Sequence, residues 1–170
     1  MKIATVLFIL ISNASFSQAI LWKENFKLDW KNFKGPTEDQ DVAAVTHCGI
    51  RVKPTVKVLV KGKATYTAFA EFTCDSSFYF PQKVDSLVLA HEQLHFDIAE
   101  LFARKLRQRF TDRGFITPVE ARNLFNKLHK EYFDFQSRIE EETSHGTKLE
   151  EEKKWEQFVS NAIRELNKYK

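Results

Sequence analysis

Two histidines and a glutamate stand together in the stretch HEQLH, as His91, Glu92 and His95. Residues four apart on an α-helix lie about 40° apart around its axis and one turn apart along it. Both imidazoles could therefore bind one cation, and Glu92 could take a proton from a water held at the same place. HExxH on a helix is the signature of zinc metallopeptidases. The stretch predicts a Zn²⁺ site with Glu92 as the general base.

The element that must position these side chains is a helix that begins before them and continues well beyond. Asp85 is the expected N-cap, and Gly114 is the expected end. On this helix both histidines fall within the apolar stripe, where an imidazole without a partner would be unfavourable. The stripe follows the three-and-four spacing of a buried helix face and consists of Leu87, Val88, Leu94, Ile98, Phe102 and Leu106.

A catalytic zinc takes three protein ligands and leaves a fourth position for water, so one more ligand is needed. A metzincin would carry glycine and histidine where this chain has Ile98 and Leu101, and it would need a methionine turn, whereas the only methionine is Met1. That class is excluded. Gluzincins take a glutamate from a following helix, where the nearest candidate, Glu120, is expected to cap the helix start.

The end of that second helix, EETSHG, offers two further candidates, Glu142 and His145. A histidine just before a C-terminal glycine is also explained by its favourable interaction with the helix dipole. The residues alone leave the choice between these two open. His47 and His129 are weaker candidates, because one lies in a predicted strand and the other in mid-helix.

The chain begins with the pattern of a secretory signal peptide. Residues 1–17 combine Lys2, a short apolar run and small residues at the cleavage-type positions, which predicts cleavage near Ser17 and Gln18. We therefore expect an exported, periplasmic or extracellular protein whose mature chain, residues 18–170, is one domain. No later segment is apolar enough to span a bilayer, so no stable membrane insertion is expected.

Composition narrows the class of partner. The formal net charge is +3, and no aromatic-and-basic pattern stands out, so a nucleic-acid partner is not expected. The chain is 43% hydrophobic, with 16 phenylalanines, as suits a packed core. In an exported protein the two cysteines, Cys48 and Cys74, favour a disulfide, with two separate buried thiols as the alternative.

Hydrophobic periodicity predicts an α+β fold. From Ile20 to Phe80 the period is two, with strands expected over 42–52, 56–60 and 64–73, and their tight turns favour antiparallel pairing. A polar loop is expected over 37–41. The N-terminal antiparallel sheet is thus followed by the HExxH helix.

Two further helices should complete the fold. Thr117, Pro118 and Glu120 form a helix start with an N-cap, a first-position proline and a capping-box glutamate. This helix should run to about Thr143, and a third should extend from about Leu149 to Leu166.

Three segments of the chain resemble a bacterial family of exported proteins described as secreted zinc-dependent proteases with a zincin-like site. They are Trp30-x-x-Phe33-x-Gly35-Pro36, LAHEQLHFDIAELFARKL, and Thr143-x-His145-Gly146 followed by Trp155. The resemblance implies a zincin-like metal helix and a site role for His145. Relatives carry an aromatic-acidic pair ahead of the threonine, whereas this chain has Ile139 and Glu140, so no tyrosine is available there to stabilise a transition state.

The function expected from these observations is an exported zinc peptidase with His91, His95 and His145 as metal ligands. Its partner would be a peptide or protein substrate, which could add as an extended strand to the sheet edge. Arg138 and Tyr132 are candidates for stabilising the oxyanion. The alternatives are a non-catalytic exported domain that only holds metal and a protein-interaction domain whose histidines bind none.

Overall fold

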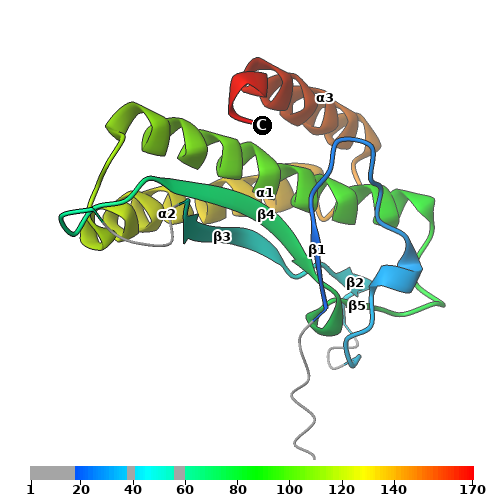
Figure 1. Cartoon of the computed structure of the whole chain (residues 1–170). Coiled ribbons are helices and arrows are strands. Elements are labelled where there is room, and N and C mark those ends of the chain that lie inside the picture. Colours follow the sequence, from blue (N-terminus) through cyan, green and yellow to red (C-terminus); the bar gives the residue numbers. More distant parts are fainter. Residues whose placement is uncertain (1–17, 38–40, 56–59) are drawn as a thin grey trace, which may run out of the picture.

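The computed structural model describes residues 18–37, 41–55 and 60–170. A sheet formed by the N-terminal half of the chain packs on a long helix, α1 (Ser86–Arg113), and two further helices follow, α2 (Pro118–Thr143) and α3 (Leu149–Glu165). Figure 1 shows α1 lying along the sheet, with α2 and α3 on different sides of α1. The predicted α+β class is confirmed, and α1 packs against β3, β4, α2 and α3.

The main sheet has three antiparallel strands in the order β1 (Ala19–Leu21), β4 (Tyr66–Thr73) and β3 (Cys48–Pro54). Two short strands, β2 (Ala44–Val45) and β5 (Phe78–Tyr79), form a second antiparallel pair. The expected antiparallel pairing is therefore confirmed for β3 and β4. The single strand predicted over 42–52 is divided in the structure between β2 and β3.

Two of the sequence predictions fall partly on undescribed positions. Residues 56–59 of one expected strand and 38–40 of the expected loop lie outside the described residues, as does the predicted signal peptide, 1–17. The turn expected after residue 60 is present, because Val60 and Lys63 form an antiparallel bridge around Lys61 and Gly62.

Small side chains bring α1 close to the sheet. Ala68 and Ala70 of β4 are buried, as are Ala99 and Ala103 of α1. Phe72 follows Ala70 on the same face of the strand, as the period of two requires, and its ring packs on Phe96 of α1 at a centroid distance of 5.9 Å.

Each long helix begins where the sequence predicted. Asp85 accepts hydrogen bonds from the backbone of Leu87 and Val88 and so caps α1, which ends at Gly114. Thr117 and Glu120 form the reciprocal capping box at the start of α2. Among the described residues, none of the helices has the length and hydropathy that a membrane span requires.

The predicted disulfide between Cys48 and Cys74 is absent, and both are free thiols. Cys48 pairs across the sheet with Phe72, and its sulfur lies 3.3 Å from the carbonyl oxygen of His95 and 3.5 Å from the hydroxyl of Tyr132. Cys74 is buried in the short helix after β4. The Cys48 sulfur thus contacts α1 and α2 instead of Cys74, and the alternative of two separate thiols is the correct one.

Candidate metal centre

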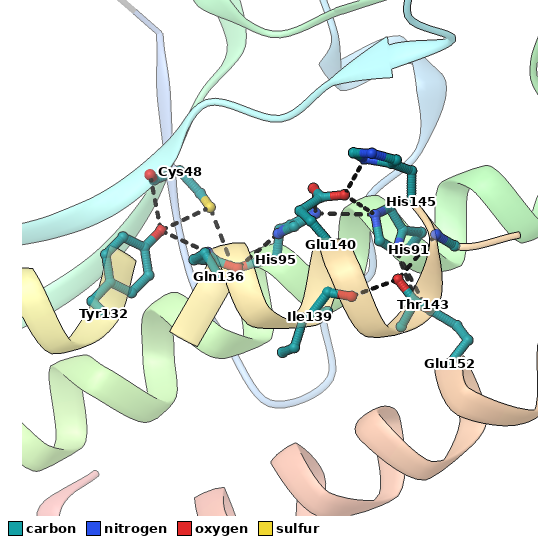
Figure 2. A network of polar contacts seen from close by, with 11 residues as sticks. Cys48, His91, His95, Tyr132, Gln136, Ile139, Glu140, Thr143, His145 and Glu152 are labelled. Carbon is teal, nitrogen blue, oxygen red and sulfur yellow. Dashed lines mark hydrogen bonds and ion pairs between the residues drawn. The ribbon is translucent and has the colours of Figure 1, made fainter. Parts of the chain in front are cut away.

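His91 and His95 converge as the helical spacing predicted. Their Nε2 atoms are 3.1 Å apart, and their rings meet nearly edge to face with centroids 4.6 Å apart. Both rings point from α1 toward α2, as Figure 2 shows. Two imidazole nitrogens thus meet at one place, where a single cation could bind both.

The third group at this place is Glu140, near the end of α2. Its Oε1 lies 2.8 Å from Nε2 of His95, and its Oε2 lies 3.5 Å from Nε2 of His91. Two ligand atoms of a tetrahedral zinc with bonds of about 2.0–2.1 Å lie roughly 3.3 Å apart. The separations among the three side chains lie on both sides of that value, so His91, His95 and Glu140 fit one ion.

The carboxylate of Glu140 is surrounded by histidine nitrogens. Its Oε2 is sealed from solvent and lies 2.6 Å from Nδ1 of His145 and 3.5 Å from Nε2 of His91, both as ion-pair contacts. Buried charged groups are paired or coordinate metals. Two imidazoles and a carboxylate are a donor set that suits zinc, which is a structural reason to expect a cation between Glu140 and the two histidines.

The other ring nitrogen of each histidine, Nδ1, contacts a further side chain. Nδ1 of His91 lies 3.1 Å from the carboxylate of Glu152 on α3, and Nδ1 of His95 lies 2.7 Å from Oε1 of Gln136 on α2. An Nδ1–H that donates to each acceptor leaves the Nε2 lone pair for a metal, and metal-binding histidines are oriented in this way. All three helices therefore contribute to the candidate centre.

In the absence of a metal, protons balance the charge of these groups. Burial lowers the pKa of His91, but hydrogen bonds to Glu140 and Glu152 outweigh it and raise the pKa to about 10. Burial would raise the pKa of Glu140, yet hydrogen bonds from His91 and His95 hold the pKa of that carboxyl well below its usual range. The cluster therefore favours positive charge between the imidazoles and Glu140.

The turn after α2 explains the local sequence TSHG. The Thr143 hydroxyl donates to the Ile139 carbonyl and accepts from the Gly146 amide, which holds the turn against the helix end. Ser144, His145 and Gly146 all have left-handed backbones, with φ of 50°, 56° and 75°. A Cβ on Gly146 would lie 2.8 Å from Cγ of His91. Glycine at 146 thus allows the backbone to lie directly against the first histidine.

The structure brings Glu140, rather than the predicted His145, into the group of three. The His145 side chain is 82% exposed and contacts the group only through Glu140. The other candidate, Glu142, is bonded elsewhere, with one oxygen 2.7 Å from Arg138 and the other 3.0 Å from the indole nitrogen of Trp155. The structure therefore does not bring Glu142 to the two histidines, and a ligand role for His145 stays a prediction.

The sequence analysis did not identify Glu140 as a ligand. A usable signal was present, since gluzincins take a glutamate from a following helix and Glu140 lies on that helix. The glutamate considered from that helix, Glu120, caps the helix start as expected.

Glu92, the predicted base, is only 6% exposed and follows His91 directly on α1. Within the described part of the chain its carboxylate forms no hydrogen bond or ion pair. Buried ionisable groups are usually paired. A carboxylate kept unpaired beside a candidate metal ligand is available to a water molecule, as a general base must be.

The other residues considered from the sequence do not join the cluster. Arg138 is bonded to Glu142 and lies over the ring of Trp155, so it faces away from Glu140. The Tyr132 hydroxyl accepts a hydrogen bond from Gln136 at 2.9 Å, and Gln136 in turn contacts His95. Tyr132 is therefore linked to His95 through Gln136.

Neither weaker histidine lies at the cluster. His47 bonds through its backbone amide to Ser77, and His129 packs on the ring of Phe125.

No protein-family model, curated protein or solved structure matches the chain.

Proposed function

We propose that the protein is an exported, zinc-dependent peptidase with a zincin-like site. His91, His95 and Glu140 would hold the ion, and Glu92 would act as general base. The observation that carries the proposal is the meeting of two Nε2 atoms and the Glu140 carboxylate at zinc-like separations. When bound, zinc supplies a Lewis acid that polarises a carbonyl group and acidifies water.

The chain's own residues account for the proton transfers. Glu92, buried and without a described partner, takes a proton from the attacking water and delivers it to the leaving amine. Glu152 and Gln136 keep the two imidazoles turned toward Glu140 while this happens.

The substrate would be an extended peptide, because β3 is an edge strand of the described sheet. The Thr73 amide donates to the His47 carbonyl, and the Thr55 amide donates to the Thr65 carbonyl. In this antiparallel pair the odd-numbered residues of the β3 segment therefore point their backbone N–H and C=O groups toward β4. Ile50 therefore directs its N–H and C=O away from β4. A peptide backbone could pair with this free edge.

One contact is compatible with the proposed cleavage near Ser17. The backbone nitrogen of Gln18 lies 2.7 Å from Oδ2 of Asp75. Cleavage before Gln18 would turn this amide into an ammonium group, which would form an ion pair with the same carboxylate. N-terminal sequencing of protein recovered from outside the cytoplasm tests this part of the proposal, and a retained Met1 would contradict it.

The decisive variant is Glu92→Gln, assayed with an unfolded protein substrate such as labelled casein. We expect one zinc per chain in both parent and variant, and turnover reduced at least about 100-fold in the variant, the usual contribution of a general base. Glu141→Gln, which changes an exposed glutamate of α2, is the matched control and should keep full activity. Equal turnover in Glu92→Gln and the parent would show that the base is another group.

A non-catalytic metal-holding domain is the competing function, and His145 is the observation that favours it. Its Nδ1 is 2.6 Å from the Glu140 carboxylate, so a small movement could bring a fourth ligand to the ion. A site with four protein ligands leaves no position for water and is structural. A parent protein that binds zinc tightly but cleaves no peptide, with His145→Ala lowering its zinc affinity, would favour that function.

A further inference from the structure

The face of α2 that carries Glu140 continues toward the start of the helix as a row of aromatic rings. Phe125, His129 and Phe133 lie within about 60° of Glu140 around the helix axis, at spacings of four and seven residues. Phe133 is 54% exposed, and the other two rings are half-buried. We call these three residues the aromatic ladder.

The three rings of the aromatic ladder form one surface. The centroids of Phe125 and His129 are 4.9 Å apart, and those of His129 and Phe133 are 4.6 Å apart with the planes nearly perpendicular. The surface extends over two helical turns, about 12 Å. That length could accommodate one or two large side chains of a bound chain.

The aromatic ladder is continuous with the candidate metal centre. Phe133 packs against Tyr132, whose hydroxyl bonds to Gln136, the residue that holds His95. The same hydroxyl donates to the carbonyl of Cys48, the first residue of β3, at 3.3 Å. Figure 2 shows Tyr132 and Gln136 of α2 beside Cys48, at this end of β3. A peptide on the edge of β3 would therefore reach both the metal centre and the ladder.

Packing within the domain does not account for the exposure of this row. The residues of α2 that are buried against the core, among them Leu128 and Ile139, form a neighbouring stripe about 100–120° from Glu140 around the helix axis. Of the aromatic ladder, Phe125 packs partly against the core. The neighbouring charged side chains Lys130 and Asp134 pair with each other at 2.8 Å, and Phe133 keeps 54% of its surface exposed. Exposed aromatic surface of this kind beside a polar site commonly marks a place where a ligand binds.

We propose that the aromatic ladder is a specificity subsite that receives a large apolar side chain, aromatic above all, of an extended peptide. The proposal rests on the proposed peptidase function and names its substrate class. Aromatic and apolar groups are favoured there because the rings offer both buried area and edge-to-face contacts.

The test measures binding separately from cleavage. Zinc-loaded Glu92→Gln protein serves as a trap, and two fluorescent peptides of equal length, one with phenylalanine and one with alanine at the central position, are titrated by fluorescence anisotropy. We expect the phenylalanine peptide to bind on the order of ten-fold more tightly. Phe133→Ala in the same background should abolish that preference, and Phe133→Leu should keep part of it.

Phe158→Ala is the matched control, because Phe158 is 52% exposed but lies on α3, where it packs on Trp155. It should leave the preference unchanged. Binding of the two peptides with equal affinity, absence of binding by either, or a preference that survives Phe133→Ala would each overturn the subsite. Far-ultraviolet circular dichroism and zinc content of each variant confirm that it has folded.

Cleavage of the same two peptides by the parent protein decides the proposed function separately. If neither peptide is cleaved but the trap keeps its Phe133-dependent preference, the peptidase proposal fails and the subsite stands. If both are cleaved at equal rates and Phe133→Ala changes neither rate, the subsite fails and the peptidase stands.

Discussion

Replacing Gly146 with alanine tests how the backbone after α2 positions His91. Gly146 has φ of +75°, and an added Cβ would lie 2.8 Å from Cγ of His91. Carbon atoms in ordinary contact are about 3.5–4.0 Å apart. The ring or the turn must therefore move by roughly 0.7 Å, and Nδ1 of the ring is held by the carboxylate of Glu152.

The size of the expected effect follows from that displacement. Alanine in a left-handed conformation costs about 1–2 kcal/mol of stability at any exposed turn. Zinc sites accept ligand distances only within about 0.2 Å of their usual values, so a displaced His91 should also bind zinc poorly. We expect Gly146→Ala to weaken zinc binding about 10- to 100-fold, as the loss of an outer-shell partner does.

Gly62→Ala is the matched control, because Gly62 has φ of +73° but nothing within 4 Å of its would-be Cβ. It should lose stability, measured by thermal unfolding in chelator, and keep parental zinc affinity, measured by competition with a fluorescent chelator. The reasoning is refuted if Gly146→Ala binds zinc within about two-fold of the parent, or if both variants lose affinity equally.

Three further predictions follow from the geometry of the site. Glu140→Gln should lower zinc affinity by more than about 100-fold, beyond the usual effect of outer-shell changes. Glu142→Gln, two residues along α2, should leave zinc affinity unchanged. A large loss of zinc affinity in Glu142→Gln and none in Glu140→Gln would assign the ligand role to Glu142 instead. Glu152→Gln should weaken zinc binding by about 10-fold through loss of the carboxylate beside Nδ1 of His91, and an unchanged affinity would remove α3 from the centre. Burial raises the pKa of Cys48 to about 12. Because the thiolate is the reactive form, alkylation of Cys48 in the folded protein should be slow at pH 8 and should accelerate as the pH rises toward 12. Rapid labelling of Cys48 in the native protein at pH 8, detected by mass spectrometry, would contradict this.

Local sequence signals predicted the elements that position the site. Capping at Asp85 and at Thr117 is decided by residues within one turn, so both helix starts could be found from the chain alone. The convergence of His91 and His95 also follows from spacing on a single helix.

The missed features depend on contacts between distant segments. Residues 140, 141 and 142 point about 100° apart in succession, and only the packing of α2 on α1 decides that Glu140 faces the histidines. Likewise, the pairing of Cys48 with Phe72 turns its sulfur toward Tyr132, and no count of cysteines could reveal this.

The central claim is that His91, His95 and Glu140 hold one divalent ion with a position left for water. X-ray absorption at the zinc edge of the zinc-loaded protein tests it most directly. The account predicts one zinc per chain, with two imidazole nitrogens and oxygen ligands at about 2.0–2.1 Å, and loss of one oxygen ligand in Glu140→Ala. A spectrum dominated by sulfur, or one that Glu140→Ala leaves unchanged, would contradict it.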